Sequence, residues 1–273
     1  MRMDISPRND FPLLARDYVQ SLERGLAIIK AFGPESSTLT LGEAASKTGL
    51  TRAAARRFLL TLVKLGYVGT DKKTFWLRTR ILELGYSYLS SQPWWQVAQP
   101  VLEEAGRQTQ ETCNIAVLSD TEIVYVARVI AKRIISTNLG VGSRLPAHVT
   151  ALGRVLMAGL SPNEQKHLLK GIKLTKLTSK TIDDKKKLEA VLDQVRQSGY
   201  AMVDQELELG LLALAVPIRS PSGGVLAALG VSVNAGRVTP EQLVKRVLPI
   251  LRHSSDLITK GLHEHNPTAA GLT

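Results

Sequence analysis

Three arginines lie within six residues, at positions 52, 56 and 57, in the stretch TRAAARRFLLTLVKLGYV that begins at Thr51. Guanidinium groups at this spacing suit nucleic acid, because arginine can hydrogen-bond the edge of a guanine with two N–H groups. Across residues 47–80 the chain carries nine basic residues and one acidic residue. Much of the net charge of +11 in the 273-residue chain therefore lies in one short window, which favours an anionic partner.

The apolar pattern predicts three helices up to and through this stretch. Helical spacing indicates helices over residues 18–32 and 41–47, and Gly49 permits the tight turn that follows. A third helix begins after Thr51, whose hydroxyl can cap it, and ends at Gly66. Its expected buried stripe consists of Ala54, Ala55, Phe58, Leu59, Leu62 and Leu65. The arginines then remain on or beside the outer side of this helix.

A short hairpin follows, with predicted strands at 67–68 and 74–77 and two lysines at its tip. Helix, helix, turn, helix and hairpin in this order make a winged helix-turn-helix, in which the second helix of the motif enters the major groove. The wing lysines would reach a phosphate or the minor groove. We therefore expect double-stranded DNA to be bound by Thr51, Arg52, Arg56, Arg57, Lys72 and Lys73. The alternative is a basic helix face that is merely solvated.

The remainder of the chain reads as an α+β domain with an antiparallel sheet. Strands are predicted at 114–118, 123–129, 134–138, 200–204, 212–219 and 225–233, and helices at 150–159, from Ser161, at 184–198 and at 239–263. Ser161 and Glu164 have the spacing of a capping box. The expected organisation is a polar arm at 1–17, a winged helix-turn-helix domain at 18–80, a linker helix at 81–92, a second domain at 93–265 and a tail at 266–273.

Four segments resemble the IclR family of bacterial transcriptional regulators: SLERGLAIIKAF, LGEAASKTGLTRAAARRFLLTLVKLGYV, LPAHVTALGRVLMAGL and GYAMVDQELELGLLALAVPI. The last, with Asp204 and Glu206, is close to the family's signature, and the resemblance runs from Val19 to His263. The segment VGSRLPAHVTALGRVLMA also resembles the branch that controls aromatic-acid catabolism through the β-ketoadipate pathway. The resemblance implies a GAF-like effector domain and homodimers, or tetramers built as dimers of dimers, on palindromic operators. RNA polymerase is a further candidate partner.

The resemblance also implies a pocket for a small organic acid, such as protocatechuate or 4-hydroxybenzoate. A helix that starts near Thr150 offers free N–H groups to a carboxylate. The expected contacts are Arg133, Ser136, Asn138, His148, Thr150, Ala151, Leu152, Asp204, Ala213, Gly230 and Ser232. Structural readings stay open for three of them: a backbone-bonded loop residue for His148, a turn cap for Asp204, and close strand packing for Gly230.

Enzymatic chemistry has little support in the sequence. Asp204 and Glu206 are two apart on a strand and could serve as acid and base, and Cys113 with His148 could supply a nucleophile. No nucleophile elbow, phosphate loop, dinucleotide motif or HExxH pattern is present, and a single cysteine forms no internal disulfide. We expect a cytoplasmic protein with no catalytic residues, cofactor or metal. A ligand-independent DNA-binding protein, or a metabolite enzyme fused to a DNA-binding domain, is the alternative.

Overall fold

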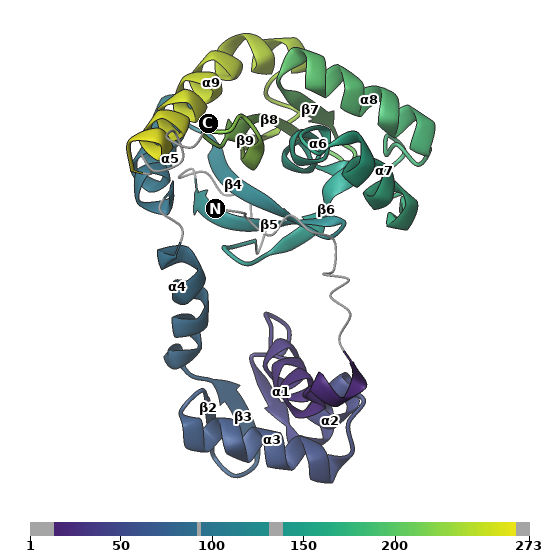
Figure 1. Cartoon of the computed structure of the whole chain (residues 1–273), viewed down its shortest axis with the longest axis vertical. Coiled ribbons are helices and arrows are strands. Elements are labelled where there is room, and N and C mark those ends of the chain that lie inside the picture. Colours follow the sequence, from purple (N-terminus) through teal and green to yellow (C-terminus); the bar gives the residue numbers. More distant parts are fainter. Residues whose placement is uncertain (1–13, 92–93, 131–138, 266–273) are drawn as a thin grey trace. The chain divides into compact units, whose positions relative to one another are not determined.

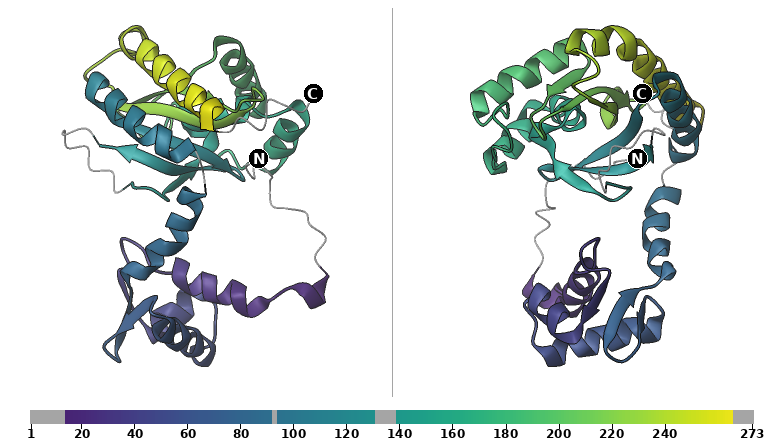
Figure 2. Two further views of the ribbon diagram at one scale, coloured as in Figure 1. Left: turned by 60° about the vertical axis from the view of Figure 1, so that its left-hand side comes forward. Right: turned by 180° about the vertical axis from the view of Figure 1, so that it is seen from behind.

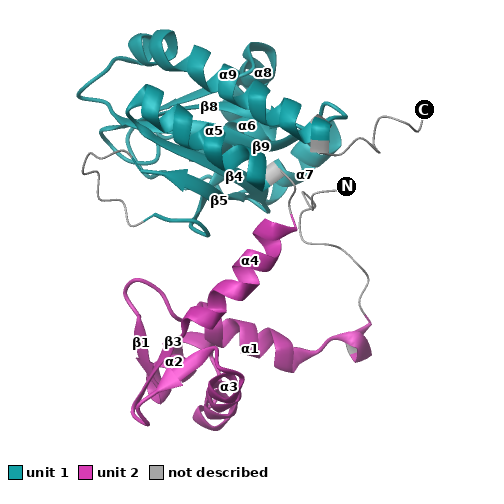
Figure 3. Ribbon diagram, turned by 90° about the vertical axis from the view of Figure 1, so that its left-hand side faces the viewer, with its two compact units in different colours: residues 1–9, 92–273 teal, residues 10–91 magenta. Residues whose placement is uncertain are grey.

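The computed structural model describes residues 14–91, 94–130 and 139–265, and Figure 1 shows its helices and strands. The chain divides into two compact units with a boundary between Ser91 and Gln92, coloured separately in Figure 3. None of the described helices is long and apolar enough to cross a membrane.

The unit that ends at Ser91 is a helical core with a small sheet. Its elements are η1 (Ala15–Asp17), α1 (Gln20–Lys30), β1 (Thr38–Thr40), α2 (Leu41–Thr48), α3 (Arg52–Leu65), β2 (Val68–Thr70), β3 (Thr74–Leu77), η2 (Thr79–Ile81) and α4 (Leu82–Ser90). The three strands are antiparallel in the order β1-β3-β2. The predicted helices and hairpin are confirmed. Strand β1 was not predicted.

Local signals fix the helix-turn-helix. Helix α2 begins with a capping box between Thr40 and Glu43, and it ends at Gly49 in the left-handed conformation, with φ of 66°. Apolar side chains of α1, α2, α3 and the sheet share one core, which includes Ile28, Leu59 and others. The predicted stripe of α3 is wrong at its end, because Leu65 in the last turn is half exposed beyond this core.

The second unit is built on a six-stranded sheet. Its elements are α5 (Trp94–Thr109), β4 (Thr112–Ser119), β5 (Glu122–Val129), β6 (Arg144–Pro146), η3 (Ala147–Val149), α6 (Ala151–Ala158), α7 (Pro162–Gly171), α8 (Lys185–Ser198), β7 (Ala201–Asp204), β8 (Leu211–Arg219), β9 (Val225–Asn234) and α9 (Pro240–His265). All strand pairs are antiparallel, in the order β6-β5-β4-β9-β8-β7. The expected α+β fold is confirmed, although α5 and β6 were not predicted. The strand predicted at 134–138 lies outside the described residues.

Helices cover the sheet of this unit on both faces. Helices α5 and α9 lie together against β4, β5 and β8, as Figures 1 and 2 show. Helices α6, α7 and α8 cover the other face, where their apolar side chains form one cluster with inward residues of the strands. The predicted capping box between Ser161 and Glu164 opens α7. Because α6 is buried along its whole length, the residues before it are held firmly against the sheet.

Candidate functional site

One surface of the first unit is basic and open. Arg52, Arg56 and Arg57 are exposed on α3, and their guanidinium groups form no ion pair with any described residue. Arg52 extends over α2, because a Cβ added to Gly42 would lie 3.3 Å from its Nη2. Thr51 accepts a hydrogen bond from the N–H of Ala54, at 3.2 Å, and so caps α3 as predicted. These side chains are therefore free to meet an external anion.

The tip of the wing is rigid although its lysines are exposed. The Asp71 carboxylate accepts hydrogen bonds from the N–H groups of Lys73 and Thr74, at 2.9 and 2.6 Å, and these bonds lower the pKa of Asp71. Lys72 has a left-handed backbone, with φ of 80°. These bonds shape the backbone of the turn, and two adjacent lysine side chains are exposed at its tip. This arrangement suits phosphate contacts, which position a protein on DNA.

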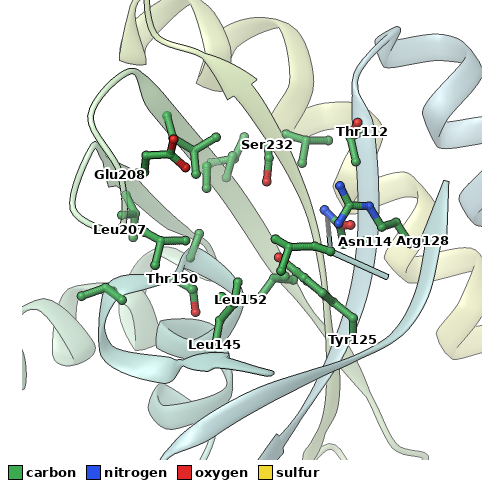
Figure 4. Close-up of a pocket in the computed structure, with 18 residues that line it drawn as sticks. Thr112, Asn114, Tyr125, Arg128, Leu145, Thr150, Leu152, Leu207, Glu208 and Ser232 are labelled. Atoms are coloured by element: carbon green, nitrogen blue, oxygen red, sulfur yellow. The ribbon is translucent and has the colours of Figure 1, made fainter. Parts of the chain in front are cut away.

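The second unit contains a cavity of about 510 Å³. Residues of β4, β5, β6, β7, β8 and β9, of η3, of the start of α6 and of the loop between β7 and β8 line it, and Figure 4 draws their side chains. Its lining residues are Thr112, Asn114, Tyr125, Arg128, Leu139, Leu145, Val149, Thr150, Ala151, Leu152, Val203, Leu207, Glu208, Leu211, Ala213, Leu214, Val231 and Ser232. The size lies within the range of about 300–1,000 Å³ that is typical of small-molecule sites.

One end of the cavity is polar. Asn114 and Arg128 are paired across strands β4 and β5, and the Arg128 guanidinium lies over the Tyr125 ring, 5.8 Å from its centroid (Figure 4). Asn114 is 2% exposed, and its Oδ1 accepts no hydrogen bond from the described residues. Burial also raises the pKa of Tyr125. The Arg128 guanidinium suits an anionic ligand group, and the buried Asn114 Oδ1 is an acceptor that is costly to leave without a donor.

The start of α6 forms a second wall. The Thr150 hydroxyl accepts a hydrogen bond from the N–H of Gly153 at 3.1 Å and donates one to the carbonyl of Ala147 at 3.3 Å. Ala151 and Leu152 follow it along the lining. The hydroxyl of Thr150 is thus already engaged in capping. The wall that it and Leu152 present is therefore mainly apolar.

The predicted contacts separate into three groups. Thr150, Ala151, Leu152, Ala213 and Ser232 line the cavity. Three others lie outside the described residues: Arg133, Ser136 and Asn138. The remaining three do not line the cavity: His148, Asp204 and Gly230. Each of the last three has a structural explanation for its place.

Asp204 lies at the end of β7, and its carboxylate forms an ion pair outside the cavity. Its carboxylate accepts hydrogen bonds from Lys180 Nζ at 2.7 Å and from Gln205 Nε2 at 3.0 Å. These two partners lower the pKa of Asp204, with Lys180 the larger cause. Asp204 and Lys180 line a smaller hollow beside the first turn of α9. The prediction that Asp204 contacts the same ligand as Ser232 therefore has no geometric support.

His148 and Gly230 serve packing. His148 is buried in η3, its ring nitrogens form no well-aligned hydrogen bond with described residues, and burial lowers its pKa. A Cβ at Gly230 would lie 2.7 Å from the carbonyl oxygen of Leu214 and 3.1 Å from Leu152 Cδ2. Glycine here therefore permits Leu152 to reach its place in the cavity wall.

Several lining residues were missed in the sequence, above all Asn114, Tyr125 and Arg128. A signal was present, because Asn114 is a polar residue within the otherwise apolar stretch CNIAVL and Thr112 precedes it by two positions. The position of Arg128 opposite Asn114 depends on strand register, which an irregularity between Ile115 and Ala116 shifts. Leu207 and Glu208 come from a loop whose path no pattern predicted.

The groups considered for catalysis are not arranged for it. Cys113 is buried, and burial raises its pKa to about 11, so its thiolate is scarce at neutral pH. Glu206 forms an ion pair with Arg154, and Asp204 forms a different one with Lys180. Over the described residues, no group of three or more His, Cys, Asp or Glu side chains could hold a metal ion.

A basic helix-turn-helix in the same chain as an α+β unit with a ligand-sized cavity defines a DNA-binding regulatory protein. Two family models match: the IclR helix-turn-helix domain over residues 21–72 and the bacterial transcriptional regulator IclR C-terminal domain over residues 86–260. The chain therefore belongs to the IclR family of transcriptional regulators, as the resemblance indicated.

Individual relatives give a finer picture. The chain is 45% identical to the Pca regulon regulatory protein of Pseudomonas putida, over 88% of this chain and 82% of that one. It is 39% identical to the p-hydroxybenzoate hydroxylase transcriptional activator of Acinetobacter baylyi, over 92% and 94%. Among solved structures, a transcriptional regulator from Rhodococcus sp. RHA1 matches with a TM-score of 0.83 and 45% identity, over 90% and 99%.

A solved ligand complex also matches part of the chain. It is the inducer binding domain of a double mutant of the PobR transcription factor from Acinetobacter, in complex with 3-hydroxybenzoic acid. The TM-score is 0.56 with 38% identity, over 59% of this chain and 94% of that one. These relatives fit the branch of the family that controls aromatic catabolism.

Proposed function

We propose that this transcriptional regulator responds to a small aromatic acid, of the class of 4-hydroxybenzoate and protocatechuate, bound in the 510 Å³ cavity. The observation that carries the proposal is the polar end formed by Arg128 and Asn114, whose Oδ1 accepts no hydrogen bond from the described residues, facing apolar walls. The carboxylate of the ligand lies against Arg128. Its ring lies between Tyr125 and Leu152.

The relatives support this class of ligand. The Acinetobacter activator is named for p-hydroxybenzoate hydroxylase, and the inducer binding domain from Acinetobacter holds 3-hydroxybenzoic acid. For the present chain, the chemistry of the lining points the same way, because an aromatic acid has one anionic end and a flat apolar body. An aliphatic dicarboxylate would need a second cation, and the opposite end of the cavity carries Glu208 instead.

Titration calorimetry with 4-hydroxybenzoate and with protocatechuate tests the proposal. Arg128→Met should weaken binding about 10- to 100-fold, because a hydrogen bond to a charged group contributes about 1.5–3 kcal/mol. Arg107→Met is the matched control: Arg107 lies on α5, its side chain is 74% exposed, and it forms an ion pair with Glu104. Failure of both acids to bind the unaltered protein would contradict the aromatic class. If Arg128→Met binds the acids as tightly as the unaltered protein does, the ligand carboxylate does not contact Arg128.

The proposed DNA-binding surface lies on the first unit. Thr51, Arg52, Arg56 and Arg57 on α3, with Lys72 and Lys73 on the wing, form the proposed operator contacts. Two observations support these contacts. The side chains are exposed and form no ion pair with a described residue, and hydrogen bonds of Asp71 shape the backbone of the wing tip. The arginines of α3 would read bases, and the lysines would bind phosphates or the minor groove.

A second copy of the chain is the proposed partner for two apolar faces. Leu22 and Leu26 on α1, and Leu82 and Tyr86 on α4, are i,i+4 pairs whose side chains are exposed, the last two by 69% and 71%. Exposed apolar pairs on helices suit burial between protomers. A dimer would also match the symmetry of a palindromic operator. Assembly into dimers of dimers and contact with RNA polymerase belong to the same proposal.

The alternatives are less well supported by these observations. A ligand-independent DNA-binding protein would not need a cavity with an unpaired polar end. An enzyme would need a nucleophile or an acid–base pair, and neither Cys113 nor Asp204 is placed for either role. We therefore propose a regulator without enzymatic activity or cofactor that acts in the cytoplasm, where bacterial operators lie.

A further inference from the structure

A buried ion pair lies behind the cavity wall. Arg154 Nη2 and Glu206 Oε2 are 2.6 Å apart, and the two side chains are only 3% and 8% exposed. Burying both charges is expensive, and an apolar pair of similar volume is often as stable. The ion pair is therefore poorly explained by stability alone. Its position relative to the cavity suggests what else it does.

The pair joins three segments that no strand or helix ladder connects. Arg154 Nε donates to the carbonyl of His148 at 3.0 Å, which holds η3 against α6. The Glu206 carboxylate also accepts from the N–H of Ile182 at 3.0 Å, and its backbone carbonyl accepts from the Thr181 hydroxyl at 2.7 Å. The segment before α8 and the loop after β7 are thereby fixed to the start of α6.

Two of these segments carry cavity walls. Thr150 to Leu152 lie one turn before Arg154, and Leu207 and Glu208 directly follow Glu206. Neither Arg154 nor Glu206 itself lines the cavity. The pair therefore sits behind both walls and sets the distance between them. A ligand placed between Leu152 and Leu207 depends on that distance.

Among the residues that the structure describes, no other hydrogen bond or ion pair joins the loop after β7 to α6. Gln205 adopts a left-handed backbone, with φ of 59°, and its side-chain oxygen accepts from the N–H of Gly210 at 2.9 Å. Its own carbonyl accepts from the Thr178 hydroxyl at 2.7 Å. These bonds shape the loop and tie it to the segment before α8. Within the described residues, its ion-paired link to α6 is that of Glu206 with Arg154.

We propose that Arg154 and Glu206 are positioning residues for the effector: their ion pair holds the 205–211 loop at the distance from α6 that selects one aromatic acid over another. This inference rests on the proposed function. It goes beyond it by assigning specificity to two side chains that touch no ligand. A longer or bulkier acid is excluded by the fixed separation of the walls rather than by a direct clash with a charged group.

The test compares three variants in the full-length protein. Glu206→Gln removes one charge, and Arg154→Met/Glu206→Leu replaces the pair by apolar side chains that keep the interior filled. Asp193→Asn is the matched control, because Arg196 and Asp193 also lie 2.6 Å apart but on the exposed side of α8. Calorimetry with 4-hydroxybenzoate and protocatechuate gives both affinities, and amide hydrogen exchange without ligand reports on the loop.

The expected result is a change in selectivity together with a loose loop. Both pair variants should bind the preferred acid at least 10-fold more weakly than the unaltered protein does. The ratio of their affinities for 4-hydroxybenzoate and protocatechuate should move towards one. Exchange at 205–211 should accelerate at least 10-fold, whereas the 220–223 turn and the control variant stay unchanged. A double variant that folds and keeps wild-type affinity, ratio and exchange overturns the inference.

Two further outcomes remain informative. If neither acid binds the unaltered protein, the proposed effector class fails, while the exchange rates of the pair variants still decide whether the pair holds the loop. If the variants do not fold, the unaltered protein supplies the test. Saturating 4-hydroxybenzoate should then slow exchange at 205–211 more than at 220–223, and equal slowing overturns the inference.

Discussion

The carboxylate of Asp204 lies 2.7 Å from Lys180 Nζ, whereas that of Glu206, two residues later, lies 2.6 Å from Arg154 in the interior. Strand alternation would place both acids on one face. Gln205 between them has a left-handed φ of 59°, and β7 ends at Asp204, so the alternation stops there. One acid therefore faces the surface and the other the core, and they cannot work as a catalytic pair.

Asp204→Asn should leave effector binding unchanged within about twofold, because its partner Lys180 does not line the cavity. The surface ion pair contributes at most about 1 kcal/mol to the free energy of unfolding. Lys180 lowers the pKa of Asp204, so this contribution is present above the ordinary aspartate value of about 4 and is lost as pH falls through the folded-state pKa. Urea unfolding at pH 7 and pH 3 measures it. A gap between variant and wild type that widens at pH 3 would contradict the assignment.

Substitutions in the first unit should separate base reading from phosphate contact. Arg52→Ala and Arg56→Ala should lower discrimination between operator and unrelated duplex by about 1–3 kcal/mol each. Lys72→Asn should weaken every duplex alike, and asparagine suits the left-handed backbone at this position. Competition gel shifts at fixed salt provide the measurement, with Lys186→Ala in the second unit as control. Identical behaviour of the arginine and lysine variants would refute the groove assignment.

The helix-turn-helix was predictable because its signals are local. The cap at Thr51, the left-handed Gly49 and the apolar stripe of α3 each depend on neighbours within a few residues. The same holds for the capping box at Ser161. The exposure of Arg52 and Arg56 then follows from helical geometry, so the proposed DNA surface could be located without coordinates.

The cavity was only partly predictable because it is assembled over long range. Thr150 was expected from the helix start and Leu152 from the family resemblance, but Arg128 meets Asn114 only through the register of β4 against β5. Helix α5, which contains Pro100 in its interior, was not predicted. The inward turn of Glu206 depends on one left-handed residue, which no periodic pattern encodes.

Gly153→Ala, at the start of α6, should strongly destabilise the second unit. A Cβ there would overlap the backbone of Ala147, which cannot move without breaking the η3 contact with Arg154. The expected loss is about 3 kcal/mol or more in the free energy of unfolding, since overpacking against backbone does not relax. Gly171→Ala is the control, because nothing lies within 4 Å of its added Cβ. Equal melting temperatures for the two variants would contradict this packing.

Cys113 should resist alkylation in the folded protein. Burial raises its pKa to about 11, so only about one thiol in a thousand is ionised at pH 8, and the side chain is also inaccessible. Its folded-state pKa is raised above the ordinary thiol value, so the resulting stabilisation is complete below about pH 8.5 and is lost as pH rises towards 11. Iodoacetamide labelling followed by mass spectrometry should therefore track unfolding in urea. Rapid labelling without urea would show that the thiol is open.

The apolar faces of α1 and α4 lead to a prediction about assembly. Leu82→Glu and Tyr86→Glu each place a charge where we propose that a second protomer packs, and in a symmetric dimer each change occurs twice. The dimer dissociation constant should rise at least about 100-fold, because buried aromatic and aliphatic anchors commonly contribute 2 kcal/mol or more each. Light scattering after size exclusion gives the mass, and Leu177→Glu, an exposed leucine in the second unit, is the matched control. If the α4 variants and the control all keep the assembly mass of the unaltered protein, α4 does not mediate self-association.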